Sequence, residues 1–120
     1  MHELAIAEGI IEALKEEVDG RITSIKLKIG EMSGIMPSAL EFVFHIASKG
    51  TIAEGAVLHI EHIPLTVRCS DCSETFRVKD YCFECASCRG GNFRIIAGRE
   101  LLIEEVEVDD IKPSPQERGI

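Results

Sequence analysis

Hydrophobic and polar residues alternate with two different periods along this chain, and each period predicts a different element. From Glu3 to about Val18 the apolar residues recur at helical spacing, with glutamates left for the solvent side, so an amphipathic helix is predicted there. Gly20 is a natural stop for this helix. The positions that we expect on its buried face are Leu4, Ala7, Ile10 or Ile11, Leu14 and Val18.

Two further stretches have the two-residue period of strands that are buried on one face. In the first, apolar residues alternate with Lys26 and Lys28, and the second runs from about Ala56 to Ile63, where Pro64 ends it. The inward-facing residues are predicted to be Ile25, Leu27 and Ile29 in the first strand and Leu58 and Ile60 in the second.

A loop and a second helix separate these two strands. The loop is expected at residues 30–34, and the helix begins at Pro37 or Ser38, because Ser38 and Glu41 have the spacing of a capping box. Gly50 closes the helix. Its buried face is expected to contain Leu40, Val43, Phe44 and Ala47.

A third apolar-rich stretch, from Leu101 to Val108, predicts a strand, although Glu104 and Glu105 interrupt its alternation. We expect this strand to return to the sheet of the first two strands, so that the segment before it is inserted in a domain and not appended to one. Beyond this strand, prolines among polar residues predict a flexible tail at residues 111–120.

Two Cys-x-x-Cys pairs lie in that inserted segment. Cys69 and Cys72 are separated by twelve residues from Cys85 and Cys88. Four thiolates complete a tetrahedron that suits Zn²⁺ and leaves no open position for a substrate water. The pairs therefore predict a structural zinc site, which must supply folding energy because so small a module has little core.

A fifth cysteine, Cys82, allows an alternative set of zinc ligands. Cys82 and Cys85 are also spaced as a pair, and a cage that used them would leave Cys88 free. Gly90 and Gly91 favour the Cys85 and Cys88 pair, because they provide the permissive backbone with which a knuckle curls over its metal. An odd number of cysteines also favours metal ligation over a disulfide framework.

Composition limits the location and the partners of the protein. No apolar run approaches the ~20 residues that span a bilayer, and the acidic Glu3 does not fit a secretory signal. A cytosolic protein without membrane contact is expected, and paired cysteines there are usually metal ligands. The net charge of −8 disfavours nucleic acid as a partner.

Together these patterns predict an α+β fold of 120 residues. A small sheet with two helices forms one domain from residues 1–64 and 99–110, and a zinc-ribbon module is inserted at residues 65–98. Two connections join the module to the sheet, so exchange of modules between two copies, and hence a homodimer, stays open.

The amino terminus offers a second set of metal donors. The α-amine of Met1, the amide and imidazole nitrogens of His2 and the amide of Glu3 can chelate one ion. Anionic amides with imidazole favour square-planar geometry, which suits Ni²⁺ or Cu²⁺. The first N–H groups of a helix have no intrahelical acceptor, so deprotonating them breaks no helical hydrogen bond. A site made from this fraying end is expected to release its metal readily. That property fits a carrier better than a metalloenzyme.

The combination of these motifs closely resembles the HypA/HybF family of hydrogenase maturation factors for nickel incorporation. The resemblance rests on Met1-His2-Glu3 ahead of an amphipathic helix, on residues 29–34 (Ile-Gly-Glu-Met-Ser-Gly), on residues 50–56 (Gly-Thr-Ile-Ala-Glu-Gly-Ala) and on the two cysteine pairs. It covers the chain from Met1 to about Val108.

This resemblance implies a nickel-binding domain that carries a zinc ribbon. It implies that His2 is the side-chain ligand of Ni²⁺, that Met1 and Glu3 contribute mainly backbone nitrogen, and that the two cysteine pairs bind Zn²⁺. The implied partners are the GTPase HypB and the large-subunit precursor of nickel–iron hydrogenase. The chain departs from the family pattern at Cys82 and at Ala86, where family knuckles often have proline.

No motif predicts an enzyme. The chain lacks a Gly-rich phosphate loop, so any GTP hydrolysis must come from a partner. Dithiol redox chemistry at the Cys-x-x-Cys pairs is the rival enzymatic interpretation, and a zinc-ribbon adaptor that carries no nickel is the rival non-enzymatic one. His45, His59 and His62 predict no site, since His59 and His62 point to opposite faces of a strand.

Overall fold

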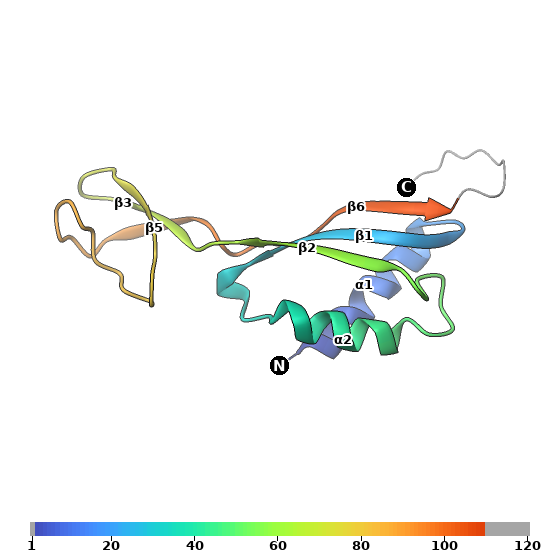
Figure 1. Cartoon of the computed structure of the whole chain (residues 1–120). Coiled ribbons are helices and arrows are strands. Elements are labelled where there is room, and N and C mark those ends of the chain that lie inside the picture. Colours follow the sequence, from blue (N-terminus) through green and yellow to red (C-terminus); the bar gives the residue numbers. More distant parts are fainter. Residues whose placement is uncertain (1, 110–120) are drawn as a thin grey trace.

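The computed structural model describes residues 2–109, which form two three-stranded sheets joined by two connections. Figure 1 shows the larger unit, with both helices, at one end of the molecule and the smaller unit at the other. The tail predicted at residues 111–120 and the residue Met1 lie outside the described residues.

The first sheet has the strand order β2-β1-β6. Its central strand β1 (Arg21–Gly30) pairs in parallel with β2 (Val57–Ile63) and antiparallel with β6 (Leu101–Asp109). The return of β6 to this sheet confirms the prediction from the third apolar stretch. The intervening segment is therefore inserted between two strands of one sheet.

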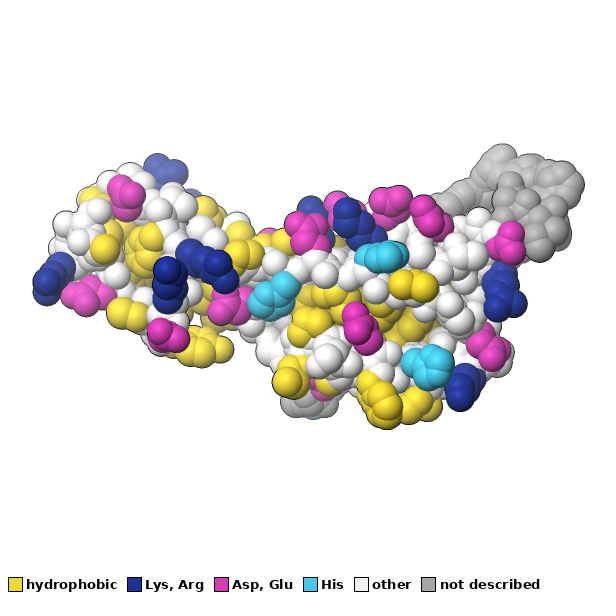
Figure 2. Space-filling model, in the orientation of Figure 1, with side chains coloured by type: hydrophobic (Ala, Val, Ile, Leu, Met, Phe, Trp, Pro, Cys, Tyr) yellow, Lys and Arg dark blue, Asp and Glu magenta, His cyan; other side chains and the backbone are white. Residues whose placement is uncertain are grey.

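Two helices, α1 (Glu3–Glu17) and α2 (Pro37–Ala47), cover one face of this sheet and pack on each other. The opposite face is polar, and there Lys26 and Lys28 both pair with Glu104, at 3.6 and 3.3 Å. The buried core between helices and sheet contains Ala7, Ile10, Ile11 and Leu14 from α1, Ile22, Ile25, Leu27 and Ile29 from β1, and Leu40 and Phe44 from α2. Hydrophobic side chains also gather over α2 on the face shown in Figure 2.

The first helix differs from its prediction at both ends. Leu4 is 50% exposed and does not belong to the core. The helix ends at Glu17, and Val18 is extended but buried. Gly20, with φ of 118°, lies in the short connection before β1, so it serves this turn and not the helix itself.

The start of the second helix also differs. No side-chain cap forms, so the predicted capping box of Ser38 and Glu41 is absent. Pro37 occupies the first turn, as one of the two alternatives predicted, and the N–H of Met36 donates to the carboxylate of Glu3 at 3.2 Å. A distant helix therefore supplies the acceptor at this end. The predicted loop at residues 30–34 contains a short 3₁₀ helix, η1 (Glu31–Ser33).

The second sheet has the order β4-β3-β5 and belongs to the inserted segment. Its strands are β3 (Thr66–Cys69), β4 (Thr75–Arg77) and β5 (Phe93–Ala97). A small core of its own consists of Leu65, Val67 and Val78, with Phe76, Phe93 and Ile95 packed against it.

Backbone contacts lock the two units together at the end of β1. The N–H of Gly30 donates to the carbonyl of Glu100 at 2.7 Å, and the N–H of Met32 donates to that of Gly98 at 2.8 Å. A Cβ atom at Gly30 would overlap the backbone of Gly98 and Arg99. Only glycine permits this close approach, which positions the second sheet relative to the first.

Candidate metal sites

Four cysteines are brought together by two turns of the same design. In the first, the N–H of Ser73 donates to the carbonyl of Cys69 at 2.9 Å, and in the second the N–H of Arg89 donates to that of Cys85 at 2.7 Å. Ser73 and Arg89 have positive φ angles of 68° and 63°. Each cysteine pair is therefore the start of a tight turn that aims two thiols toward the same point.

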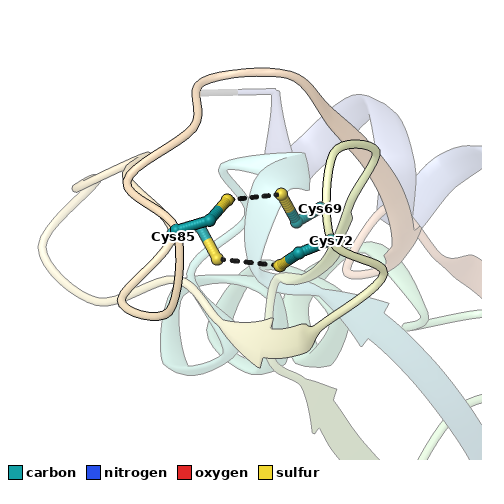
Figure 3. Close-up of side chains that lie close together, drawn as sticks. Cys69, Cys72 and Cys85 are labelled. Carbon is teal, nitrogen blue, oxygen red and sulfur yellow. Dashed lines mark hydrogen bonds between the residues drawn. The ribbon is translucent and has the colours of Figure 1, made fainter.

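The four sulfurs face one another across these turns (Figure 3). The Sγ atoms of Cys69 and Cys88 are 3.6 Å apart, as are those of Cys72 and Cys85, and all four lie within 4.8 Å of one another. A tetrahedron with Zn–S bonds of about 2.3 Å has S···S edges of about 3.8 Å. The donor set and its dimensions therefore fit a four-thiolate zinc site.

Gly90, shortly after the second cysteine pair, is needed because it has no side chain and not, as predicted, because its backbone is permissive. The residue with positive φ is Arg89, whereas a Cβ atom at Gly90 would overlap the carboxylate of Asp71 and press on the Cys88 sulfur. The N–H of Gly90 also points to Cys88 Sγ, at 3.4 Å. The spacing of the cysteines gives no sign of Asp71, because its approach to Gly90 depends on how the two turns face each other.

Backbone amides, burial and neighbouring thiols shift the pKa values of Cys72 and Cys85 in opposite directions. The amide of Cys88 stabilises the Cys85 thiolate, and together with the amide of Ser87 it outweighs the cost of burial and lowers the pKa of Cys85 to about 7. The amide of Glu74 acts in the same direction on Cys72, but burial and the neighbouring thiols outweigh it and raise that pKa to about 12. Cys85 therefore loses its proton to a metal more readily than Cys72 does.

At the amino terminus, His2 is exposed and immediately precedes α1. Its carbonyl accepts the N–H of Ile6 at 3.0 Å, as the first hydrogen bond of the helix. The carboxylate of Glu3 accepts the Met36 amide, which anchors the start of α1 against the start of α2. This anchor was missed by the sequence analysis. Met1, the third residue predicted for this site, lies outside the described residues.

A model of the family described as hydrogenase/urease nickel incorporation, metallochaperone, hypA, matches residues 1–108. The chain belongs to the HypA family. The hydrogenase maturation factor HypA of Geobacter sulfurreducens is 39% identical over 110 residues, which cover 91% of this chain and 100% of that protein. The HypA of Dehalococcoides mccartyi is 40% identical over 114 residues, covering 92% and 96%.

Two solved HypA structures share the fold. The solution structure of the Ni metallochaperone HypA from Helicobacter pylori matches with a TM-score of 0.60 and 24% identity, over 90% of this chain and 97% of that one. A second solution structure of a HypA protein matches with a TM-score of 0.62 and 26% identity, over 90% and 96%. These findings confirm the predicted family and α+β fold. HypA is a family of metallochaperones and not of enzymes.

In this HypA chain, the fifth cysteine stands outside the cluster. Cys82 is exposed, and its N–H donates to the carbonyl of Lys79 at 2.9 Å. Among residues 2–109, the cysteines that meet are those of the cage favoured by the sequence analysis. That they bind zinc stays a prediction.

The remaining histidines do not join a metal cluster within the described part of the HypA chain. His45 on α2 and both histidines of β2 are exposed. In register, His59 lies beside Lys26 and His62 lies beside Ile29, and these two β1 residues point to opposite faces of the sheet. In the same part of the chain, no helix is both long and apolar enough to cross a membrane.

Proposed function

We propose that this HypA protein binds Ni²⁺ at its amino terminus and delivers it for the maturation of nickel–iron hydrogenase. The observation that carries the proposal is the exposed His2 directly ahead of α1, in a chain that belongs to a nickel-incorporation family. An exposed site at a helix terminus can form around an incoming ion and open again without disturbing the core.

The proposed nickel ligands are nitrogen atoms. The His2 imidazole is the side-chain ligand, and the α-amine of Met1 and the first amides complete a set that suits square-planar Ni²⁺. The contact between the Glu3 carboxylate and the Met36 amide supports a backbone role for Glu3, because its side chain is engaged with the second helix.

The four-cysteine cluster is proposed to hold a structural Zn²⁺. The metal would join the turn after β3 to the turn before β5, in a unit whose own core has three buried residues, Leu65, Val67 and Val78. The separate sheets and cores support the proposed division into a nickel domain at residues 1–64 and 99–110 and a zinc-ribbon domain at 65–98.

The proposed partners follow from this role. A GTPase, HypB, would supply the nucleotide hydrolysis for which this chain has no phosphate loop, and the large-subunit precursor of nickel–iron hydrogenase would be the destination of the nickel. We also propose a cytosolic location, and the net charge of −8 supports a protein that binds no nucleic acid. A homodimer that exchanges zinc-ribbon domains remains compatible with the two connections.

Equilibrium dialysis against Ni²⁺ tests the function directly. His2→Ala should lose nickel binding and keep its zinc, whereas the matched variant His45→Ala, which removes another exposed histidine, should keep both metals. Undiminished nickel binding by His2→Ala would place the site elsewhere. A native protein that contains zinc but takes up no nickel would favour the alternative of a zinc-ribbon adaptor.

A further inference from the structure

An apolar groove of about 260 Å³ runs between α1 and the first half of β6. One wall is a row of small residues on α1, and the other is the start of the strand. Among residues 2–109, none of the proposed metal ligands lines it. The residues that line the groove include Ala5, Gly9 and Ala13 from α1, Leu27 from β1, and Leu101 and Ile103 from β6.

The strand beside this groove lies at the edge of the sheet. In the order β2-β1-β6, one side of β6 pairs with β1, and the other side has no partner strand among residues 2–109. Leu101, Leu102 and Ile103 remain 44%, 53% and 38% exposed. An edge with unpaired backbone groups next to an apolar groove is the arrangement to which an extended peptide adds as a further strand.

The helical rim of the groove is acidic. Glu8, Glu12 and Glu16 follow the small residues of α1 by three positions each, so they lie on the neighbouring stripe of the helix. All three are exposed, and Glu12 forms an ion pair with Lys15 at 3.6 Å. A positively charged segment would be attracted to this rim.

The polar face of β6 has the same sign. Lys26 and Lys28 are both engaged by Glu104, while Glu105 and Glu107 add negative charge along the strand. A second copy of β6 laid against the first would bring these acidic strands together, and like charges on paired strands are destabilising. The charge therefore disfavours a second copy and favours a basic partner.

Side chains of an added strand would alternate between two environments. Every second residue would face α1 and enter the apolar groove, and the residues between them would face the side on which β6 presents its glutamates. We propose that β6 and the groove beside α1 bind an extended segment of a partner protein in which Val, Ile or Leu alternates with Lys or Arg.

The first experiment uses three blocked eight-residue peptides and the full chain. One alternates Val and Lys, the second is the same peptide with every backbone nitrogen methylated, and the third has Glu in place of Lys. By fluorescence anisotropy, the first should bind and slow the amide exchange of β6, and the others should bind at least about tenfold more weakly. Equal binding of the methylated peptide, which keeps the charge but has no backbone N–H left to donate on either edge, would overturn strand addition.

A groove-filling variant supplies the second measurement. A Cβ atom at Gly9 meets nothing within 4 Å, so Gly9→Leu should fold, as circular dichroism can verify, and place its side chain in the groove. Gly91→Leu is the control, because its Cβ also meets nothing, but in the other unit. We expect about tenfold weaker binding of the Val-Lys peptide for Gly9→Leu and no change for Gly91→Leu. Unchanged binding by Gly9→Leu would overturn the proposal.

Two other occupants of the groove would give results that differ from those expected for a partner protein. A native dimer that Gly9→Leu splits in sedimentation would show that a second copy fills the groove, and the proposal would be wrong. The second occupant is the segment 110–120 of the same chain. If a chain that ends at Asp109 bound the peptide about tenfold more tightly than the full chain does, residues 110–120 would compete for the groove and the proposal would be wrong. Equal peptide affinity of the full and the shortened chain, together with an oligomeric state that Gly9→Leu leaves unchanged, would support a separate partner.

Discussion

The carboxylate of Glu31 accepts a hydrogen bond from the backbone amide of Leu65, with 2.8 Å between Oε1 and the nitrogen. Glu31 begins the 3₁₀ helix after β1, and Leu65 is the first buried residue of the inserted unit. This bond lies beside the backbone contacts of Gly30 and Met32 with the return connection. The short segment at residues 30–32 therefore contacts both connections between the two sheets, and these contacts set the direction in which the second sheet extends.

Removal of the Glu31 carboxylate should weaken this junction. Glu31→Ala leaves the Leu65 N–H without its acceptor, which should cost about 1–3 kcal/mol in the free energy of unfolding. Glu31→Gln keeps a carbonyl oxygen at the same place and should cost less. Urea denaturation gives the free energies, and amide exchange at Leu65 reports the bond itself. Equal costs for both variants would mean that the bond contributes little.

Gly30 and Gly9 should respond in opposite directions to the same substitution. Gly30→Ala forces a Cβ atom into the backbone of Gly98 and should destabilise the protein by about 2 kcal/mol or more. Gly9→Ala adds its Cβ in open space on a helix and should stabilise the protein by about 0.5–1 kcal/mol. Thermal unfolding of the two variants measures both effects. A tolerated Gly30→Ala would show that the junction can open without cost.

Substitutions at Cys88 and Cys82 provide a matched pair of variants that test the zinc site. Both are exposed, but only Cys88 belongs to the sulfur cluster. Cys88→Ala should lower the zinc content well below the expected value of about one ion per chain and expose the amides of β3 and β5 to exchange. The amides of α1 should stay protected, because that helix has a separate core. Full zinc in Cys88→Ala together with its loss in Cys82→Ala would reverse the ligand assignment.

Acetylation of the amino terminus should abolish most nickel binding. It removes the α-amine as a ligand and adds no nickel donor, so the affinity should fall by about tenfold or more, comparably to His2→Ala. Zinc content, measured in the same samples, should not change. Addition of a glycine before Met1 is a poorer test, because His2 would then take the third position and could form a different four-nitrogen chelate. Undiminished affinity after acetylation would exclude the amine.

The sequence by itself determined the elements and the chemistry of the cysteines. The alternation of Ile25, Leu27 and Ile29 with lysines specified a half-buried strand, and helical spacing identified most of the buried positions of α1 and α2. The Cys-x-x-Cys spacing predicted two metal-binding turns. These properties depend on residues that lie within a few positions of one another, where the local backbone geometry decides which side chains share a face.

Only the tertiary structure decided which distant groups meet. Glu3 reaches the amide of Met36 and Glu31 that of Leu65, across 33 and 34 residues, and neither contact has a local pattern. Leu4 has the correct helical spacing but is exposed, because no other element of residues 2–109 covers it. The groove beside β6 was also decided only by the tertiary structure, because its walls are brought together by the packing of α1 on the sheet. Periodicity identifies the side of an element that is apolar, whereas the packing of the whole chain determines what covers that side.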